Sequence, residues 1–279
     1  LWYSTDGGTN WTQIGGTFSA KSGTYVITGL SANTSYSVKT RLRRKDSQLT
    51  KDSSAISVKT YDYPHVTNAP NFTIGNSVKI TLYNPLSRSC SVTITAVDSS
   101  TKSAGTVSGT TLEGLNTAAW KTFFYDSIPS ATSGTYSVTV TYSGHSEQAA
   151  GGTYSINTSD SKPTITGLTY QDTNGTTTTV TQNNQKIVQT LSTVQYTASG
   201  LSAKNSASIA SVKVTVNGST YNMTVSGTSA TGGNASIDSA SNVTATATIT
   251  DSRGLTATKS VTVQMLSWSL PSGIITLHR

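Results

Sequence analysis

Residues 241–264 show the most regular alternation of hydrophobic and polar positions in the chain. Small or β-branched residues occupy every second position: Val243, Ala245, Ala247 and Ile249 on one arm, and Val261, Val263 and Met265 on the other. A period of two predicts strands with one buried face and one solvated face. The intervening segment Asp-Ser-Arg-Gly, residues 251–254, supplies a turn, so the stretch predicts a β-hairpin.

The same hairpin pattern recurs around Tyr36 and around Tyr136. The copies lie about a hundred residues apart, which is the size of one immunoglobulin-like sandwich, and they fall where its strands F and G would lie. The sequence therefore predicts an all-β protein of tandem immunoglobulin-like and fibronectin type III-like β-sandwiches joined by short linkers. Both Tyr36 and Tyr136 are predicted to be structural residues.

The turn and proline signals divide the chain into segments. We expect a partial sandwich at 1–62, sandwiches at 63–158 and 159–266, and a linker or the start of a further module at 267–279. Residues 61–70, with His65, and residues 156–163 are predicted linkers, and the chain opens inside a strand pattern, as a segment of a longer protein would.

Three local predictions fall within these sandwiches. Residues 143–152, with His145, are predicted to form a loop. A turn at residues 172–175 is expected to lead into a threonine-rich strand, and Asn217-Gly218 is the strongest short hairpin signal.

Composition and the length of the apolar runs add three expectations. Hydrophobic residues make up 34% and charged residues 11% of the chain, but the apolar positions recur at strand period, which favours thin folded sandwiches over disorder. Cys90 is the only cysteine, so it cannot form a disulfide within the chain and is predicted to be buried. No apolar run approaches the roughly 20 residues that span a bilayer, and no membrane association is predicted.

The net charge of +7 is concentrated near residue 40. Lys39, Arg41 and Arg43 alternate and Arg44 follows, so these side chains are expected on one outward strand face. One interpretation is a binding face for an anionic ligand such as teichoic acid, and the other is a solvated face that resists edge pairing. Aromatic residues are not interleaved with these cations, so nucleic acid is not a predicted partner.

The sequence shows no catalytic constellation. The 12 acidic residues are sparse, the three histidines are far apart, and no metal, nucleophile or phosphate-loop motif occurs. We expect no enzyme activity, no metal and no cofactor. Asp172 is expected in a turn and not in a calcium site. Trp120 and its aromatic neighbours are predicted to be core, and Trp268 is a candidate carbohydrate contact.

Two resemblances extend this interpretation. Leu30, followed six places later by Tyr36, resembles the tyrosine corner of fibronectin type III domains, although the first two strands of that pattern are absent before Leu1. The segments PTITGLTYQD, TQNNQKIVQTLS, TATATITDSRGLTATKSVTV and NPLSRSCSVTI resemble a siphophage tail family of unknown function.

The second resemblance implies a structural component of a phage tail, in the tip, baseplate or fibre. Such a protein would be extracellular in the virion, would act as a spacer and would attach to the host surface. Its implied partners are other tail proteins, further copies in a trimer or hexamer, and a host cell-wall polysaccharide. Two alternatives remain: a repeat region of a bacterial surface adhesin, and a carbohydrate-binding accessory module of a cell-wall hydrolase.

Overall fold

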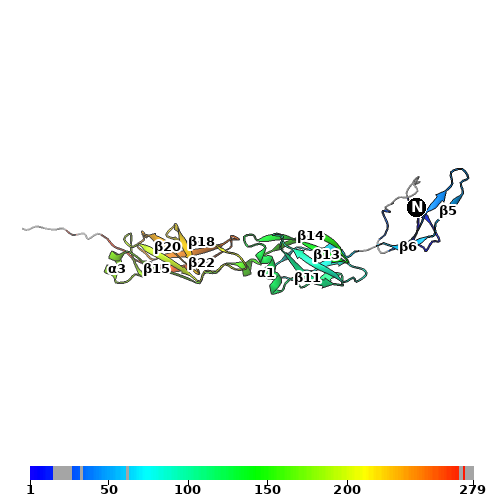
Figure 1. Ribbon diagram of the computed structural model, residues 1–279. Helices are drawn as coiled ribbons and strands as arrows, with labels where there is room; N and C mark the ends of the chain where they lie inside the picture. Colours follow the sequence, from blue (N-terminus) through cyan, green and yellow to red (C-terminus); the bar gives the residue numbers. More distant parts are fainter. Residues whose placement is uncertain (15–26, 32–33, 61–62, 270–272, 274–279) are drawn as a thin grey trace, which may run out of the picture. The chain divides into compact units, whose positions relative to one another are not determined.

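The computed structural model describes residues 1–14, 27–31, 34–60, 63–269 and 273. The chain divides into two compact units, Leu1–Pro64 and His65–Arg279. Both are built mainly from antiparallel strands, and the short helices of the described residues lie in the second unit (Figure 1). His278 and most of the predicted C-terminal linker lie outside the described residues.

The first unit is a small antiparallel sheet with an added hairpin. Its strands are β1 (Trp2–Ser4), β2 (Thr12–Gln13), β3 (Ser35–Lys39), β4 (Arg41–Arg43), β5 (Thr50–Asp52) and β6 (Ile56–Lys59). The sheet has the order β2-β1-β3-β6, and β4 pairs with β5. Tyr36 is the buried hydrophobic side chain among the described residues of this unit, whereas Ile56 and Val58 beside it are 61% and 39% exposed. This sheet face is therefore covered at Tyr36 and exposed along β6.

The second unit begins with a sandwich of two sheets and one helix, residues 65–157. Its elements are β7 (His65–Asn68), β8 (Phe72–Thr73), β9 (Ile80–Tyr83), β10 (Cys90–Thr95), β11 (Thr101–Val107), β12 (Thr111–Leu112), α1 (Ala118–Asp126), β13 (Ser133–Tyr142) and β14 (His145–Ser155). One sheet has the order β11-β10-β13-β14-β8 and the other β12-β9-β7. Strand β8 runs parallel to β14, so the entering chain closes one sheet edge.

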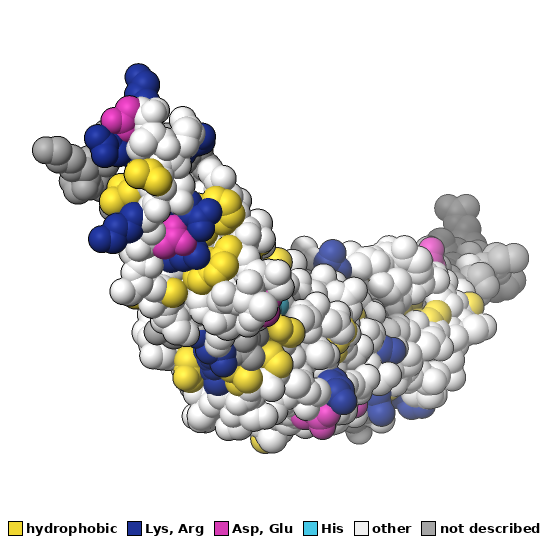
Figure 2. Space-filling view, turned by 90° about the vertical axis from the view of Figure 1, so that its right-hand side faces the viewer, with side chains coloured by type: hydrophobic (Ala, Val, Ile, Leu, Met, Phe, Trp, Pro, Cys, Tyr) yellow, Lys and Arg dark blue, Asp and Glu magenta, His cyan; other side chains and the backbone are white. Residues whose placement is uncertain are grey.

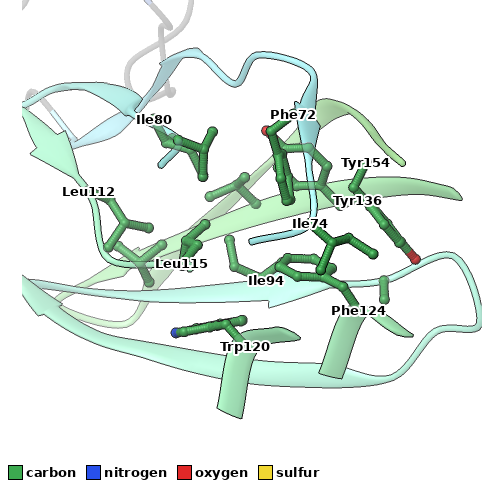
Figure 3. Packing of buried hydrophobic residues seen from close by; sticks show 14 of the residues in the cluster. Phe72, Ile74, Ile80, Ile94, Leu112, Leu115, Trp120, Phe124, Tyr136 and Tyr154 are labelled. Carbon is green, nitrogen blue, oxygen red and sulfur yellow. The ribbon is translucent and has the colours of Figure 1, made fainter. Parts of the chain in front are cut away.

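Aromatic side chains fill one end of the core of this sandwich. Phe124 from α1 packs against Phe72 and Tyr154 with ring centroids 5.1 and 4.8 Å apart (Figure 3). Trp120 is 8% exposed and stacks on Phe124. The predicted core role of the Trp120 cluster is confirmed. Cys90 is fully buried, as predicted, and burial raises the pKa of its thiol.

The third sandwich, residues 162–266, has a separate core. A short helical segment, α2 (Thr158–Ser161), precedes β15 (Gly167–Asp172), α3 (Gly175–Thr181), β16 (Lys186–Val188), β17 (Val194–Ser199), β18 (Ile209–Val216), β19 (Ser219–Ser226), β20 (Ser229–Ala235), β21 (Val243–Asp251) and β22 (Thr256–Leu266). The eight strands form one hydrogen-bonded order, β15-β17-β20-β19-β18-β21-β22-β16, around a single hydrophobic cluster.

The strongest period-two predictions are confirmed in this sandwich. Strands β21 and β22 form the predicted hairpin, and Ala245, Ala247 and Ile249 are fully buried. Asn217 and Gly218 form the tight turn between β18 and β19, with φ of 47° and 80°. Positive φ at both central residues is the geometry that favours Asn-Gly.

The prediction of a threonine-rich strand after residue 175 is wrong, because this segment forms α3. The side chain of Asn174 accepts hydrogen bonds from the backbone N–H groups of Thr176 and Thr177 and so begins the helix. Threonine hydroxyls then bond back to carbonyls one turn earlier, for example Thr179 Oγ1 to Gly175 O at 2.7 Å. Local capping thus outweighs the β propensity of threonine.

Two segments that were predicted to be irregular contain strands. His65 does not lie in a linker, because β7 pairs with β9 and Val66 packs against the core. The predicted loop at 143–152 is also wrong: it shrinks to a two-residue turn at Ser143 and Gly144, and β14 begins at His145. Polar residues occupy exposed strand positions in both segments, so the sequence lacked the alternation of apolar and polar residues that predicts a strand.

The second and third sandwiches meet through an extensive polar contact. Arg253, only 8% exposed, donates from Nε to Ile128 O at 3.1 Å and from Nη2 to Tyr125 O at 3.4 Å. Ser252 Oγ donates to Pro129 O at 2.6 Å, and Leu255 packs against the core of the second sandwich. The turn of the β21–β22 hairpin therefore docks onto the preceding sandwich.

Candidate binding surfaces

Two tryptophans and two cations interleave on the first unit. The Lys39 ammonium lies 3.9 Å from the ring centroid of Trp11, and the Arg41 guanidinium lies 4.6 Å from that of Trp2. Both rings sit on the β1–β2 hairpin, which pairs with β3. These distances are those of cation–π contacts.

Asp52 on β5 joins the two cations. Its carboxylate lies 2.7 Å from Lys39 Nζ and accepts from Arg41 Nε at 2.6 Å and Arg41 Nη2 at 2.9 Å. Hydrogen bonds from Arg41 and then Lys39 hold the pKa of Asp52 well below its usual range. The contacts tie the β4–β5 hairpin to the sheet, so Lys39 and Arg41 are largely engaged within the protein.

The other two residues of the predicted basic face, Arg43 and Arg44, lie on the β4–β5 hairpin. Arg44 pairs with Asp46 at 2.9 Å, and both side chains are well exposed. Arg43 is exposed and has no ion-pair partner among the described residues. Leu42 and Leu49 are 74% and 66% exposed. Basic and hydrophobic side chains are intermingled over the first unit (Figure 2).

Tyr36 and Tyr136 each make a hydrogen bond to the backbone through the phenol hydroxyl. Tyr36 Oη accepts a hydrogen bond from the backbone N–H of Ser31 at 2.8 Å, directly after the half-buried Leu30. Tyr136 Oη donates to Pro70 O at 2.8 Å and fixes the entry of the chain into the second sandwich. Trp268 is 40% exposed beyond the end of β22.

Asp172 forms a satisfied polar cluster. It is 4% exposed and accepts from the hydroxyls of Thr177 and Ser192 and from the backbone N–H groups of Asn174 and Thr193. Burial raises its pKa, but these hydrogen bonds outweigh burial and lower the pKa overall. These contacts fix the carboxylate at the end of β15, directly before the turn that leads into α3.

The described residues contain no group of three or more His, Cys, Asp or Glu side chains that could hold a metal ion. His65 and His145 lie on separate strands of the second sandwich. No helix in the described part of the chain is long and apolar enough to cross a membrane. The geometry defines a tandem β-sandwich protein. The polar and aromatic side chains described above contact neighbouring strands and loops of the protein itself.

The chain belongs to a family of siphovirus proteins of unknown function, DUF859, whose model matches residues 49–279. Family membership and the all-β fold indicate a phage structural protein. No curated protein matches the chain.

Several solved structures resemble the chain at low identity. Drosophila N-cadherin EC1-4 is 12% identical with a TM-score of 0.33, and the match covers 86% of this chain and 59% of that one. The titin domains Z1Z2 in complex with telethonin are 12% identical, with 74% and 98% coverage and a TM-score of 0.29. A bacterial ice-binding adhesin is 18% identical, with 74% and 64% coverage and a TM-score of 0.30. No function is transferred from these proteins.

Proposed function

We propose that this protein is a structural component of a siphophage tail, in its tip, baseplate or fibre, where it acts as a spacer and attaches to the host surface. Membership in a siphovirus family carries this proposal. The fold supports it, because sandwiches placed in series with a docked junction suit a spacer better than a catalyst.

In this proposal the first unit is a fibronectin type III-like module that supplies the attachment surface. Lys39 and Arg41 hold the β4–β5 hairpin in place through Asp52, while Arg43, Arg44 and Lys51 stay exposed on it. An anionic wall polymer would be attracted to this excess of positive charge. Trp268 is a second proposed contact, for a sugar face of a cell-wall polysaccharide.

The proposed partners follow from the same location. Other tail proteins would hold the chain in the virion, and several copies would assemble around the tail axis as a closed trimer or hexamer.

A cryo-electron microscopy map of the purified phage, with mass spectrometry of its proteins, tests the location. We expect several copies of the sandwiches around the tail axis. Absence from the virion and recovery in a bacterial cell-wall fraction would replace the proposal with the surface adhesin alternative.

Phage adsorption tests the attachment surface. The double variant Arg43→Ser, Lys51→Ser removes two charges from the hairpin, and Lys213→Ser, Lys259→Ser removes two exposed charges from the third sandwich as a matched control. We expect slower adsorption for the first pair only, with a difference that shrinks at high salt. Equal adsorption by both intact phages would contradict the role of the hairpin.

A further inference from the structure

A small polar cleft lies where the second and third sandwiches meet. Its volume is about 330 Å³, at the low end of the range of small-molecule sites. Its polar lining comes from the β8–β9 loop, α1, the α2 segment and the β17–β18 loop: Asn76, Lys121, Tyr125, Asn157, Asp160 and Asn205. Because Asn205 belongs to the third sandwich, neither sandwich completes the cleft alone.

The junction contacts hold this cleft in shape. Arg253 bonds to Tyr125 O on one side and to Asn205 O on the other, and both of these residues line the cleft. Asn205 Nδ2 donates to Asp160 O at 3.3 Å and to Ser161 Oγ at 3.0 Å. The walls are thus fixed to each other before any ligand arrives, which lowers the ordering cost of binding.

The backbone at the cleft adopts unusual conformations. Asn205 and Ser206 are consecutive non-glycine residues with φ of 52° and 66°. Gly75, on the opposite wall, has φ of 96°, and a Cβ there would lie 3.1 Å from the Cε atom of Lys121. Sparsely populated backbone conformations persist where the surrounding structure enforces them and cluster at ligand-binding sites.

Some polar groups in the cleft already make hydrogen bonds within the protein, and others do not. Asn157 caps α2 and donates to Asp160 Oδ2 at 3.0 Å. Among the described residues no hydrogen bond or ion pair engages the side-chain amide of Asn76, the ammonium of Lys121 or the second carboxylate oxygen of Asp160. Donors and acceptors therefore face the cleft together.

This set of groups fits a hydroxyl-rich ring. Carboxylate and amide oxygens accept from hydroxyls, and the ammonium and amide nitrogens donate to them. One cation and one anion give no net charge, which disfavours an anionic phosphate, and a single carboxylate is too few for a hard cation. We propose that the cleft binds one neutral hexose unit of a host-surface polysaccharide. This inference rests on the proposed attachment function.

Titration of the isotopically labelled 279-residue chain with glucose, galactose and N-acetylglucosamine, followed by amide NMR shifts, tests the site without any phage. We expect saturable shifts confined to residues 74–76, 121–125, 157–160 and 205 for at least one sugar. Lys121→Ala should weaken that binding about tenfold, the loss of roughly one hydrogen bond to a charged group. Lys79→Ala removes an exposed lysine elsewhere on the same sandwich and should leave the binding unchanged.

Shifts at Trp268 or on the first unit, or no saturable shift with any of the three sugars, would overturn the cleft proposal. Either result would leave the tail location intact, because that location is decided by the composition and map of the virion. Conversely, saturable binding in the cleft of a protein absent from virions would reject the tail role and retain the sugar site.

Discussion

At the scale of single residues, hydroxyl groups fix the course of the backbone between strands. Replacing Tyr136 with Phe removes the hydrogen bond to Pro70 O but keeps the ring contact with Phe72, whose centroid is 5.5 Å away. We expect the variant to lose about 1 kcal/mol of unfolding free energy in urea titrations. Tyr142→Phe is the control, because no hydrogen bond of the described residues involves that hydroxyl. Equal stability of both variants would contradict this role for Tyr136.

Asp172 should make stability depend on pH. Its net pKa is lowered in the folded chain, so the folded state binds its proton less readily than the unfolded state does. The stabilisation is therefore present above the ordinary carboxyl pKa near 4 and is lost as the pH falls below it. Asp172→Asn should lose about 2 kcal/mol at pH 7 and show a flatter decline in acid. Unfolding in urea from pH 7 to pH 3 measures both, and parallel pH profiles for the variant and the parent would contradict the assignment.

At the scale of elements, the cap of α3 decides between helix and strand. Replacing Asn174 with Ala removes the acceptor for two backbone N–H groups and the hydrogen bond from Nδ2 to Leu191 O at 2.8 Å. The expected cost is about 1 kcal/mol, with faster hydrogen exchange across residues 175–181. Asn222→Ala, at an exposed position of β19, should change neither quantity. Unchanged exchange in the Asn174 variant would show that tertiary packing alone holds the helix.

The same element shows what the sequence could and could not predict. Alternation with a period of two identified the hairpins at 217–218 and 241–264, because each arm buries one face. It misassigned residues 176–181, because threonine favours strands on average while a neighbouring asparagine can start a helix. The helix around Trp120 escaped detection because aromatic residues are equally typical of sandwich strands.

The binding surfaces depended on contacts that no local pattern contains. The basic residues near 40 were visible in the sequence, but their pairing with Asp52 and the tryptophan rings was not. The cleft joins residues from four separate segments between 74 and 205. The local sequence places Arg253 in a turn and gives no sign of its partner Tyr125, which lies 128 positions away.

At the scale of the whole molecule, Arg253 is expected to make the second and third sandwiches move as one body. Its guanidinium donates to carbonyls of Tyr125 and Ile128 in one sandwich and of Lys204 and Asn205 in the other. Burial lowers its pKa, but an arginine stays charged near neutral pH, so these hydrogen bonds persist there. A planar fork can serve these carbonyls together, whereas a lysine ammonium at the same place cannot.

Arg253→Ala leaves these carbonyls without their donor and should weaken the junction by about 3 kcal/mol. Spin labels on cysteines introduced at the exposed positions Lys79 and Lys213 report the distance between the two sandwiches. We expect a narrow distance distribution for the parent chain and a broad one for both Arg253→Ala and Arg253→Lys. Lys204→Ala keeps the carbonyl that Arg253 uses and should stay narrow. A narrow distribution in the Arg253 variants would mean that the remaining contacts of Ser252, Ser206 and Leu255 suffice to hold the junction, so that a spacer role would not depend on Arg253.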